Sequence, residues 1–182
     1  LNYKNAHITG IDISLSSLAY AKRKINELGI DNVELIHMDI LEVGLLEKRF
    51  DIIQCGGVLH HMNDPLQGLK ALLNILNHNG FLKLGLYSEL SRQHIVKARN
   101  YINKTNLESD RESIRTFRQS VITEKVPGLL SLTDSPDFYT LSSCRDLCFH
   151  VQEHRFTIEK IQKTLSSNKL KFLGFSLPNS VK

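Results

Sequence analysis

Short apolar segments that favour β-strand alternate with segments of helical periodicity in the first half of the chain. This alternation limits the possible folds more than any other feature. Each apolar segment is too short for a helix and is followed closely by a turn or helix signal. The expected strands are His7–Ile13, Asn32–His37, Phe50–Cys55 and Phe81–Tyr87. Strands separated by helices predict a parallel sheet that is covered by helices.

Two helices between these strands carry clear start and stop signals. Ser14 occupies an N-cap position before apolar residues that recur at helical spacing up to Leu28, and Gly29 supplies a stop. Asp64-Pro65 combines an N-cap with proline at the first helical position. The leucines from 66 to 76 line the helix that follows, and Asn79-Gly80 is expected to end it.

After Ser88 the pattern becomes mainly helical. A loop is expected at Val126–Asp137, and a closing strand at Leu170–Leu177. The expected helices are Glu89–Asn103, Glu108–Glu124, part of Phe138–Val151, and Thr157–Leu165. We therefore predict one domain over residues 1–182, with an α/β core at 1–88, a helical cap at 89–151, and a closing helix and strand at 152–182.

Composition excludes several classes of protein. The 182 residues are 41% hydrophobic and 23% charged, which is ordinary for a folded domain. The chain has neither an apolar run long enough to cross a bilayer nor the order of a signal peptide. We therefore expect no membrane association. The chain's 3 cysteines are too few for a disulfide scaffold, which favours a cytoplasmic location. Residues 89–182 carry the basic excess, with 15 Lys and Arg against 10 Asp and Glu.

Two acidic residues follow successive predicted strands. Asp12 ends the first strand and Asp39 follows the second. Ligands of open parallel sheets bind beyond the carboxyl ends of the strands, where a carboxylate can accept hydrogen bonds from both ribose hydroxyls. The Asp39 carboxylate could accept from an exocyclic amine while the Ile40 N–H donates to a ring nitrogen. The pair therefore suits an adenosine, although each acid is also the residue type of a turn or an N-cap.

Several segments in order along the chain resemble the motifs of class I S-adenosylmethionine-dependent methyltransferases. These segments are GIDIS (10–14), HMDI (37–40), FDIIQCGGVLHHMNDP (50–65) and LNHNGFLKLGLYS (76–88). The resemblance implies a Rossmann-like, doubly wound, mostly parallel sheet with S-adenosylmethionine as cofactor. It implies that Asp12 binds the ribose, that Asp39 and Ile40 bind the adenine, and that Gln54 and Cys55 approach the methionine end. Ile13 and Met38 complete the expected cofactor-binding set.

The chain departs from the family at one point, because it contains no G-x-G-x-G loop. By the resemblance, a first βα unit would precede Leu1, and its strand would lie between those that end at Asp12 and Cys55. We therefore expect a sheet lacking the first βα unit, with a helical cap insertion, in a fragment or a descendant of a longer protein. The segments at 87–102 and 137–157 are similar to bacterial methyltransferase modules fused to tetratricopeptide repeats, so such a repeat region is expected elsewhere in the full-length protein.

Two histidines are candidates for catalysis. His60 and His61 follow the third strand, and either could act as a general base or orient the methyl acceptor. The alternative is that one caps the loop while the other packs in the core. The acceptor itself is not identified by the sequence and is expected to be a small molecule or a protein. No pattern of basic and stacking aromatic residues predicts nucleic-acid binding.

Other polar groupings have structural explanations. Cys144 and Cys148 lie near His150 and His154, but their spacing does not favour zinc, so we expect no metal and buried thiols. An arginine face at positions 111, 115 and 118 could contact an acidic substrate or phosphate, although a solvated helix face is the simpler reading.

Two other functions stay open. The absent glycine loop fits a non-catalytic remnant or interaction module, and an acid after a strand also suits an NAD-dependent oxidoreductase.

Overall fold

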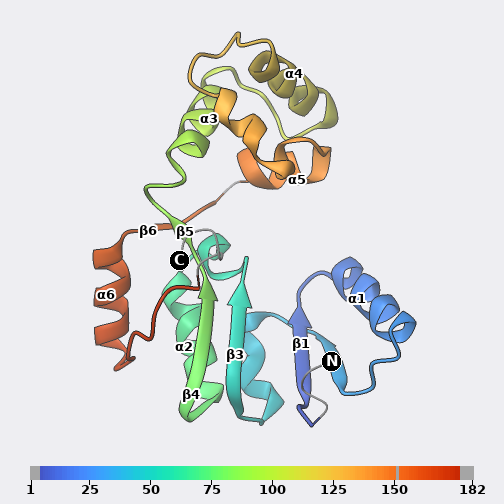
Figure 1. Ribbon diagram of the computed structural model, residues 1–182, viewed down its shortest axis with the longest axis vertical. Helices are drawn as coiled ribbons and strands as arrows, with labels where there is room; N and C mark the ends of the chain where they lie inside the picture. Colours follow the sequence, from blue (N-terminus) through green and yellow to red (C-terminus); the bar gives the residue numbers. More distant parts are fainter. Residues whose placement is uncertain (1–4, 151, 177–182) are drawn as a thin grey trace. The chain divides into compact units, whose positions relative to one another are not determined.

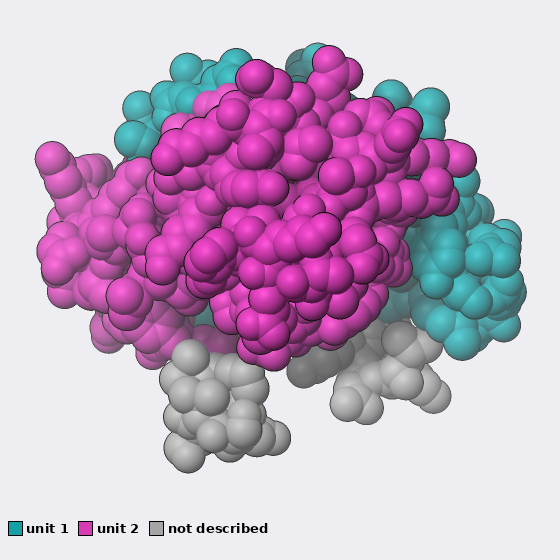
Figure 2. Space-filling view, turned by 90° about the horizontal axis from the view of Figure 1, so that it is seen from above, with its two compact units in different colours: residues 1–85 teal, residues 86–182 magenta. Residues whose placement is uncertain are grey.

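The computed structural model describes residues 5–150 and 152–176. Contacts divide the chain into two units, Leu1–Gly85 and Leu86–Lys182, which have different colours in Figure 2. Figure 1 labels their helices and strands. This division falls close to the boundary expected after Ser88. The division of the chain into domains stays a prediction.

The first unit contains the expected alternation of strands and helices. Its α-helices and strands are β1 (Ile8–Asp12), α1 (Leu15–Glu27), β2 (Val33–His37), β3 (Phe50–Gly56), α2 (Pro65–Ile75) and β4 (Leu76–Gly85). Two 3-10 helices, η1 (Ile40–Leu46) and η2 (Leu59–His61), follow β2 and β3 respectively. The α/β class that the sequence predicted is confirmed.

The strands of this unit pair in parallel, as two separate two-stranded sheets within the described residues. β1 lies beside β2 in a register that runs from Ile8 opposite Val33 to Asp12 opposite His37. β3 lies beside β4, with Gly56 opposite Gly85 at the carboxyl ends. Within each pair the carboxyl ends of the two strands therefore lie at the same edge, which is where parallel sheets bind their ligands.

The capping signals in the sequence act as expected. Ser14 Oγ accepts a hydrogen bond from Ser17 N at 3.2 Å, and Gly29 after α1 has a φ of 63°. Asp64 Oδ1 accepts from Leu66 N at 2.9 Å at the start of α2. These local bonds satisfy helix N–H groups that would otherwise have no partner.

The expected end of the second helix was wrong. α2 ends at Ile75, and β4 begins at Leu76 instead of Phe81. Leu76 pairs with Phe50, and the pairing register then shifts before Ile52 meets Phe81. Asn79, with a φ of 64°, lies within this irregular stretch. Pairing with β3 therefore overrides the leucine periodicity that predicted a longer helix.

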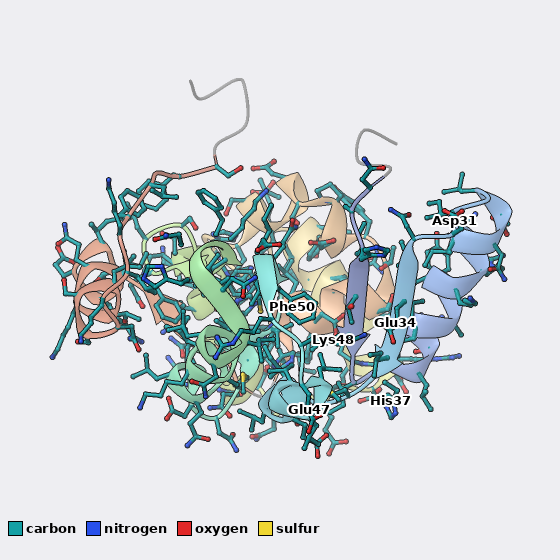
Figure 3. The ribbon with its side chains drawn as sticks, turned by 90° about the horizontal axis from the view of Figure 1, so that it is seen from below. Asp31, Glu34, His37, Glu47, Lys48 and Phe50 are labelled. Carbon is teal, nitrogen blue, oxygen red and sulfur yellow. The ribbon has the colours of Figure 1, made fainter. Side chains whose placement is uncertain are left out.

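The core of the first unit lies around β3, η1, η2 and α2. Its buried apolar residues are Val43, Cys55, Leu59, Leu69, Leu72 and Ile75. None of the residues of β1, α1 or β2 is fully buried. An ion pair between Lys48 and Glu34, at 2.9 Å, connects the segment before β3 to β2 (Figure 3). The β1–β2 pair is thus more exposed than is usual for parallel strands, which are normally covered on both faces.

The second unit is mainly helical. Its elements are β5 (Tyr87–Ser88), α3 (Gln93–Lys104), α4 (Arg111–Ile122), η3 (Leu130–Asp134), η4 (Pro136–Phe138), α5 (Leu141–Cys148), β6 (Arg155–Phe156) and α6 (Ile158–Ser167). The four expected helices correspond to α3, α4, α5 and α6. Apolar residues of α3, α4 and α5 form one buried cluster, which includes Ile95, Phe117 and Leu147.

Two expectations for this unit were wrong. The segment Val126–Asp137 is not a plain surface loop, because Leu129 and Leu132 are 1% and 0% exposed and belong to the buried cluster. Tertiary packing buries these two leucines, which the composition of the segment did not indicate. The closing strand Leu170–Leu177 is absent over residues 170–176, and Leu177 lies outside the described residues. Leu173 is 70% exposed, and no described strand pairs with this segment.

A buried carboxylate joins the two ends of the helical region in the second unit. The side chain of Glu153 has no exposed surface and accepts hydrogen bonds from Arg92 Nε at 3.3 Å and Arg99 Nη2 at 3.1 Å. Arg155 Nη1 lies 3.9 Å from the same carboxylate. Burial raises the pKa of Glu153, but the hydrogen bond and charge of Arg92 and the charges of Arg99 and Arg155 outweigh burial and lower it. The carboxylate is therefore ionised at neutral pH.

We predict that Glu153→Gln lowers the free energy of unfolding by about 3 kcal/mol at pH 7, because it leaves buried guanidinium groups without a counter-ion. The wild-type stabilisation should be complete above the ordinary glutamate pKa of 4.5 and should be lost as the pH falls through the lowered folded value. Urea unfolding of both proteins at pH 7 and at about pH 3 measures this difference.

Glu27→Gln is the matched control, because Glu27 pairs with Lys24 at 2.6 Å while its side chain is 45% exposed. Its loss should cost no more than about 0.5 kcal/mol. Equal losses in the two variants would contradict a structural role for the buried network.

Candidate functional site

Asp12 lies at the carboxyl end of β1, where the strand turns toward α1. Its carboxylate Oδ1 accepts a hydrogen bond from Ser14 N at 2.8 Å. Its Oδ2 accepts none from the residues that the structure describes, and the residue is exposed. The carboxylate therefore orders the turn with one oxygen and keeps the other available to a ligand.

Asp39 follows β2 at the same edge and begins η1. It is the N-cap of that helix, with Oδ1 accepting from Leu41 N at 2.8 Å. No described group accepts a hydrogen bond from the N–H of Ile40, the first residue of the helix. Asp39 and Ile40 are both half-buried. A free carboxylate oxygen and a free N–H thus occur on adjacent residues.

The pairing of β1 with β2 brings these groups together. Asp12 lies opposite His37, and the carbonyl of Asp12 accepts a hydrogen bond from Met38 N at 3.2 Å. His37 Nε2 donates to the carbonyl of Ile13 at 2.9 Å. Sequence reasoning did not identify His37. The available signal was its position at the end of the second strand, because Asp12 ends the first strand and the two strands pair. The His37 bond extends the contact between the two strand ends beyond the ladder.

Gln54 and Cys55 lie near the carboxyl end of β3. Gln54 is exposed while Cys55 is 7% exposed, so consecutive side chains take opposite faces of the strand. Burial raises the pKa of the Cys55 thiol, and the backbone of Leu59 lowers it only in part. Cys55 is therefore a neutral thiol at pH 7 and not a nucleophile.

The strand leads into a close approach of the backbone. Gly85 lies opposite Gly56, and a Cβ atom on Gly85 would be 3.1 Å from the Gly56 Cα. Gly57 has a φ of 75°, in the left-handed region that favours glycine. Gly57 therefore lets the chain turn sharply from β3 into η2, while Gly85 leaves room for the Gly56 backbone on the neighbouring strand.

His60 and His61 lie on η2, immediately after this turn. The His60 side chain is 1% exposed, whereas His61 is half-buried. Their ring centroids are 4.3 Å apart in an edge-to-face arrangement. His60 is therefore part of the packing of η2, and His61 is the more accessible of the two. Their catalytic roles stay predictions.

Two further findings concern the cysteines of the second unit and the helices of the whole described chain. Cys144 and Cys148 are 0% and 1% exposed and belong to the buried cluster of the second unit, as expected. Within residues 5–150 and 152–176, no helix combines the length and hydrophobicity needed to cross a membrane.

Comparison with known proteins identifies the family of the chain. Residues 1–141 match the family described as a methyltransferase domain. An uncharacterized protein of Synechococcus is 32% identical over 184 residues, covering 94% of this chain and 43% of that protein. A demethylmenaquinone methyltransferase of Listeria welshimeri is 33% identical over 76 residues, covering 42% of this chain and 32% of the enzyme. The chain therefore spans less than half the length of these relatives.

Solved structures show the same fold. The Rickettsia typhi protein PKMT2, in complex with AdoHcy, superimposes with a TM-score of 0.71 at 19% identity. The match covers 95% of this chain and 38% of that protein. This likeness confirms the Rossmann-like fold that the motifs implied. The match over residues 1–141 shows that this chain belongs to the methyltransferase domain family.

Proposed function

We propose that this chain is the cofactor-binding part of an S-adenosylmethionine-dependent methyltransferase that acts in the cytoplasm on a small molecule or a protein. The observation that carries the proposal is the arrangement at the β1–β2 edge. There, Asp12 and Asp39 each keep one carboxylate oxygen available, and the Ile40 N–H has no described acceptor. Two acceptors and one donor at a single sheet edge match the polar groups of adenosine.

Asp12 is assigned to the ribose. A carboxylate accepts hydrogen bonds from two adjacent hydroxyls, and the free Oδ2 of this exposed side chain is available for them. The Ser14 N–H on Oδ1 holds the carboxylate in one orientation before ligand arrives. A preordered acceptor loses less conformational entropy on binding.

Asp39 and Ile40 are assigned to the adenine. The Asp39 carboxylate would accept from the exocyclic amine while the Ile40 N–H donates to a ring nitrogen. Met38 and Ile40 are half-buried, so their side chains can contact the two ring faces without opening the core. The N-cap bond to Leu41 fixes the Asp39 side chain for this role.

Gln54 and Cys55 are assigned to the methionine end of the cofactor, whose sulfonium supplies the methyl group for in-line transfer to the acceptor. The neutral Cys55 thiol does not compete as an acceptor, because the thiolate is the reactive form. Positioning of the acceptor supplies much of the rate enhancement when that acceptor is already nucleophilic. His61, the more accessible histidine of η2, would hold or accept the acceptor's proton where one must leave.

The relatives support the reaction class. The Rickettsia protein is solved with AdoHcy, and the Listeria enzyme is a methyltransferase. A strand between β1 and β3, as the resemblance implies, stays part of this proposal. The separate β1–β2 and β3–β4 pairs support this inference. A repeat region elsewhere in the protein stays a prediction.

We predict that Asp12→Ala weakens S-adenosylmethionine binding by about 100-fold, since it removes two hydrogen bonds to a charged acceptor. Isothermal titration calorimetry on the full polypeptide encoded by the gene measures the change. Asp31→Ala is the matched control, because Asp31 is an exposed acid that precedes β2 at the opposite end of the strand (Figure 3).

Unchanged affinity in Asp12→Ala would contradict the ribose assignment. A wild-type protein that binds NADH more tightly than S-adenosylmethionine would favour the oxidoreductase alternative. Binding of neither ligand by the full polypeptide would favour a non-catalytic module.

We predict that Asp39→Asn keeps the N-cap of η1, because asparagine caps as well as aspartate does, but weakens cofactor binding about tenfold through loss of the charged acceptor. Asp39→Ala should in addition lower the free energy of unfolding by about 1 kcal/mol. Thermal unfolding and calorimetry on the two variants separate the capping role from the binding role. Equal cofactor affinity in wild type and Asp39→Asn would overturn the adenine assignment.

A further inference from the structure

The arginine face that the sequence indicated on α4 borders a groove in the second unit. Arg115 and Arg118 line this groove, whereas Arg111, one turn earlier on the same helix, does not. The groove has a volume of about 600 Å³ and lies along α4, the helix labelled in Figure 1. Its lining residues are Arg115, Thr116, Arg118, Gln119, Ser120, Ile122 and Lys125.

The lining is strongly basic. It has three cations, two hydroxyls and one amide, and no aspartate or glutamate. Arg115, Arg118 and Lys125 form no ion pair with any residue that the structure describes. The nearest acids in sequence, Glu112 and Glu124, do not line the groove. No acidic side chain in the described part of the chain therefore pairs with the cations of the groove.

Arg118 is the least solvated of these cations. Its Nε is buried and has no hydrogen-bond partner among the described residues, and its guanidinium carbon lies 5.8 Å from the centre of the Phe138 ring. Arg99 in the same unit is also largely buried, but it pairs with Glu153. A half-buried guanidinium without a counter-ion is costly, and an external anion would offset that cost.

We propose that this groove binds a small, multiply charged oxyanion, of the class of phosphate esters and pyrophosphates. A carboxylate brings one negative charge, whereas a phosphate monoester brings nearly two, which suits a groove lined by three cations better. Guanidinium groups bind phosphate oxygens through paired N–H bonds, and Thr116, Gln119 and Ser120 supply neutral donors beside them. The absence of aromatic residues from the lining argues against a single-stranded nucleic acid, which binds by base stacking.

The test is an NMR titration of the ¹⁵N-labelled full polypeptide encoded by the gene with inorganic pyrophosphate in about 0.15 M salt, where exposed charges are screened. We expect saturable shifts of the Arg118 Nε–H signal and of the backbone amides at 115–125. Arg118→Gln and Arg115→Gln should each weaken binding about tenfold or more, which corresponds to one lost charged contact. Arg115 is exposed, so its variant tests the site without disturbing the core.

Arg111→Gln is the matched control and should change the affinity less than about twofold, since it removes the same charge from α4 outside the groove. Equal losses in the Arg111 and Arg118 variants would show diffuse surface attraction and overturn the proposal. Shifts that do not saturate, or tighter binding of succinate than of pyrophosphate, would overturn it as well. A single-stranded oligonucleotide that binds more tightly and shifts basic residues beyond the groove would replace the small anion as the ligand.

Discussion

The parallel pairing of β1 with β2 is the constraint on which the candidate site depends. The ladder sets Asp12 opposite His37, and the next bond, from Met38 N to the Asp12 carbonyl, fixes where the chain leaves the sheet. A register shift of one residue would turn Asp12 to the other face of its strand. Because neither strand is fully buried, backbone hydrogen bonds and the His37–Ile13 contact hold this register more than core packing does.

Local chemistry decided the parts of the fold that the sequence predicted well. Ser14 and Asp64 begin helices because their side chains accept hydrogen bonds from N–H groups within three residues, and Pro65 at the first helical position has no N–H that needs a partner. Distant partners decided the parts that were wrong. Leu76 leaves its helix to pair with Phe50, Leu129 and Leu132 are drawn into a helical core, and residues 170–176 have no described strand to pair with.

The candidate site likewise has features that the sequence predicts and features that only the fold reveals. Its position at the strand ends follows from the alternation of strands and helices, so Asp12 and Asp39 could be named from sequence. The sequence also offered a turn or an N-cap as the role of each acid, and the structure shows that one oxygen of each carboxylate has that role while the other stays available. The difference in exposure between His60 and His61 also depends on how η2 packs, which their adjacent positions do not reveal. Only the fold shows that Arg115 and Arg118 line the basic groove and that Arg111 does not.

The carboxylate of Glu153 and the guanidinium of Arg92, 61 positions apart, close a long loop of chain. Closure entropy grows only with the logarithm of loop length, so each doubling costs about 0.6 kcal/mol. Natural insertions or deletions between these two residues should therefore be tolerated as long as both remain. The helical region between them can therefore change in size while β5 and β6, the strands at its entry and exit, stay paired.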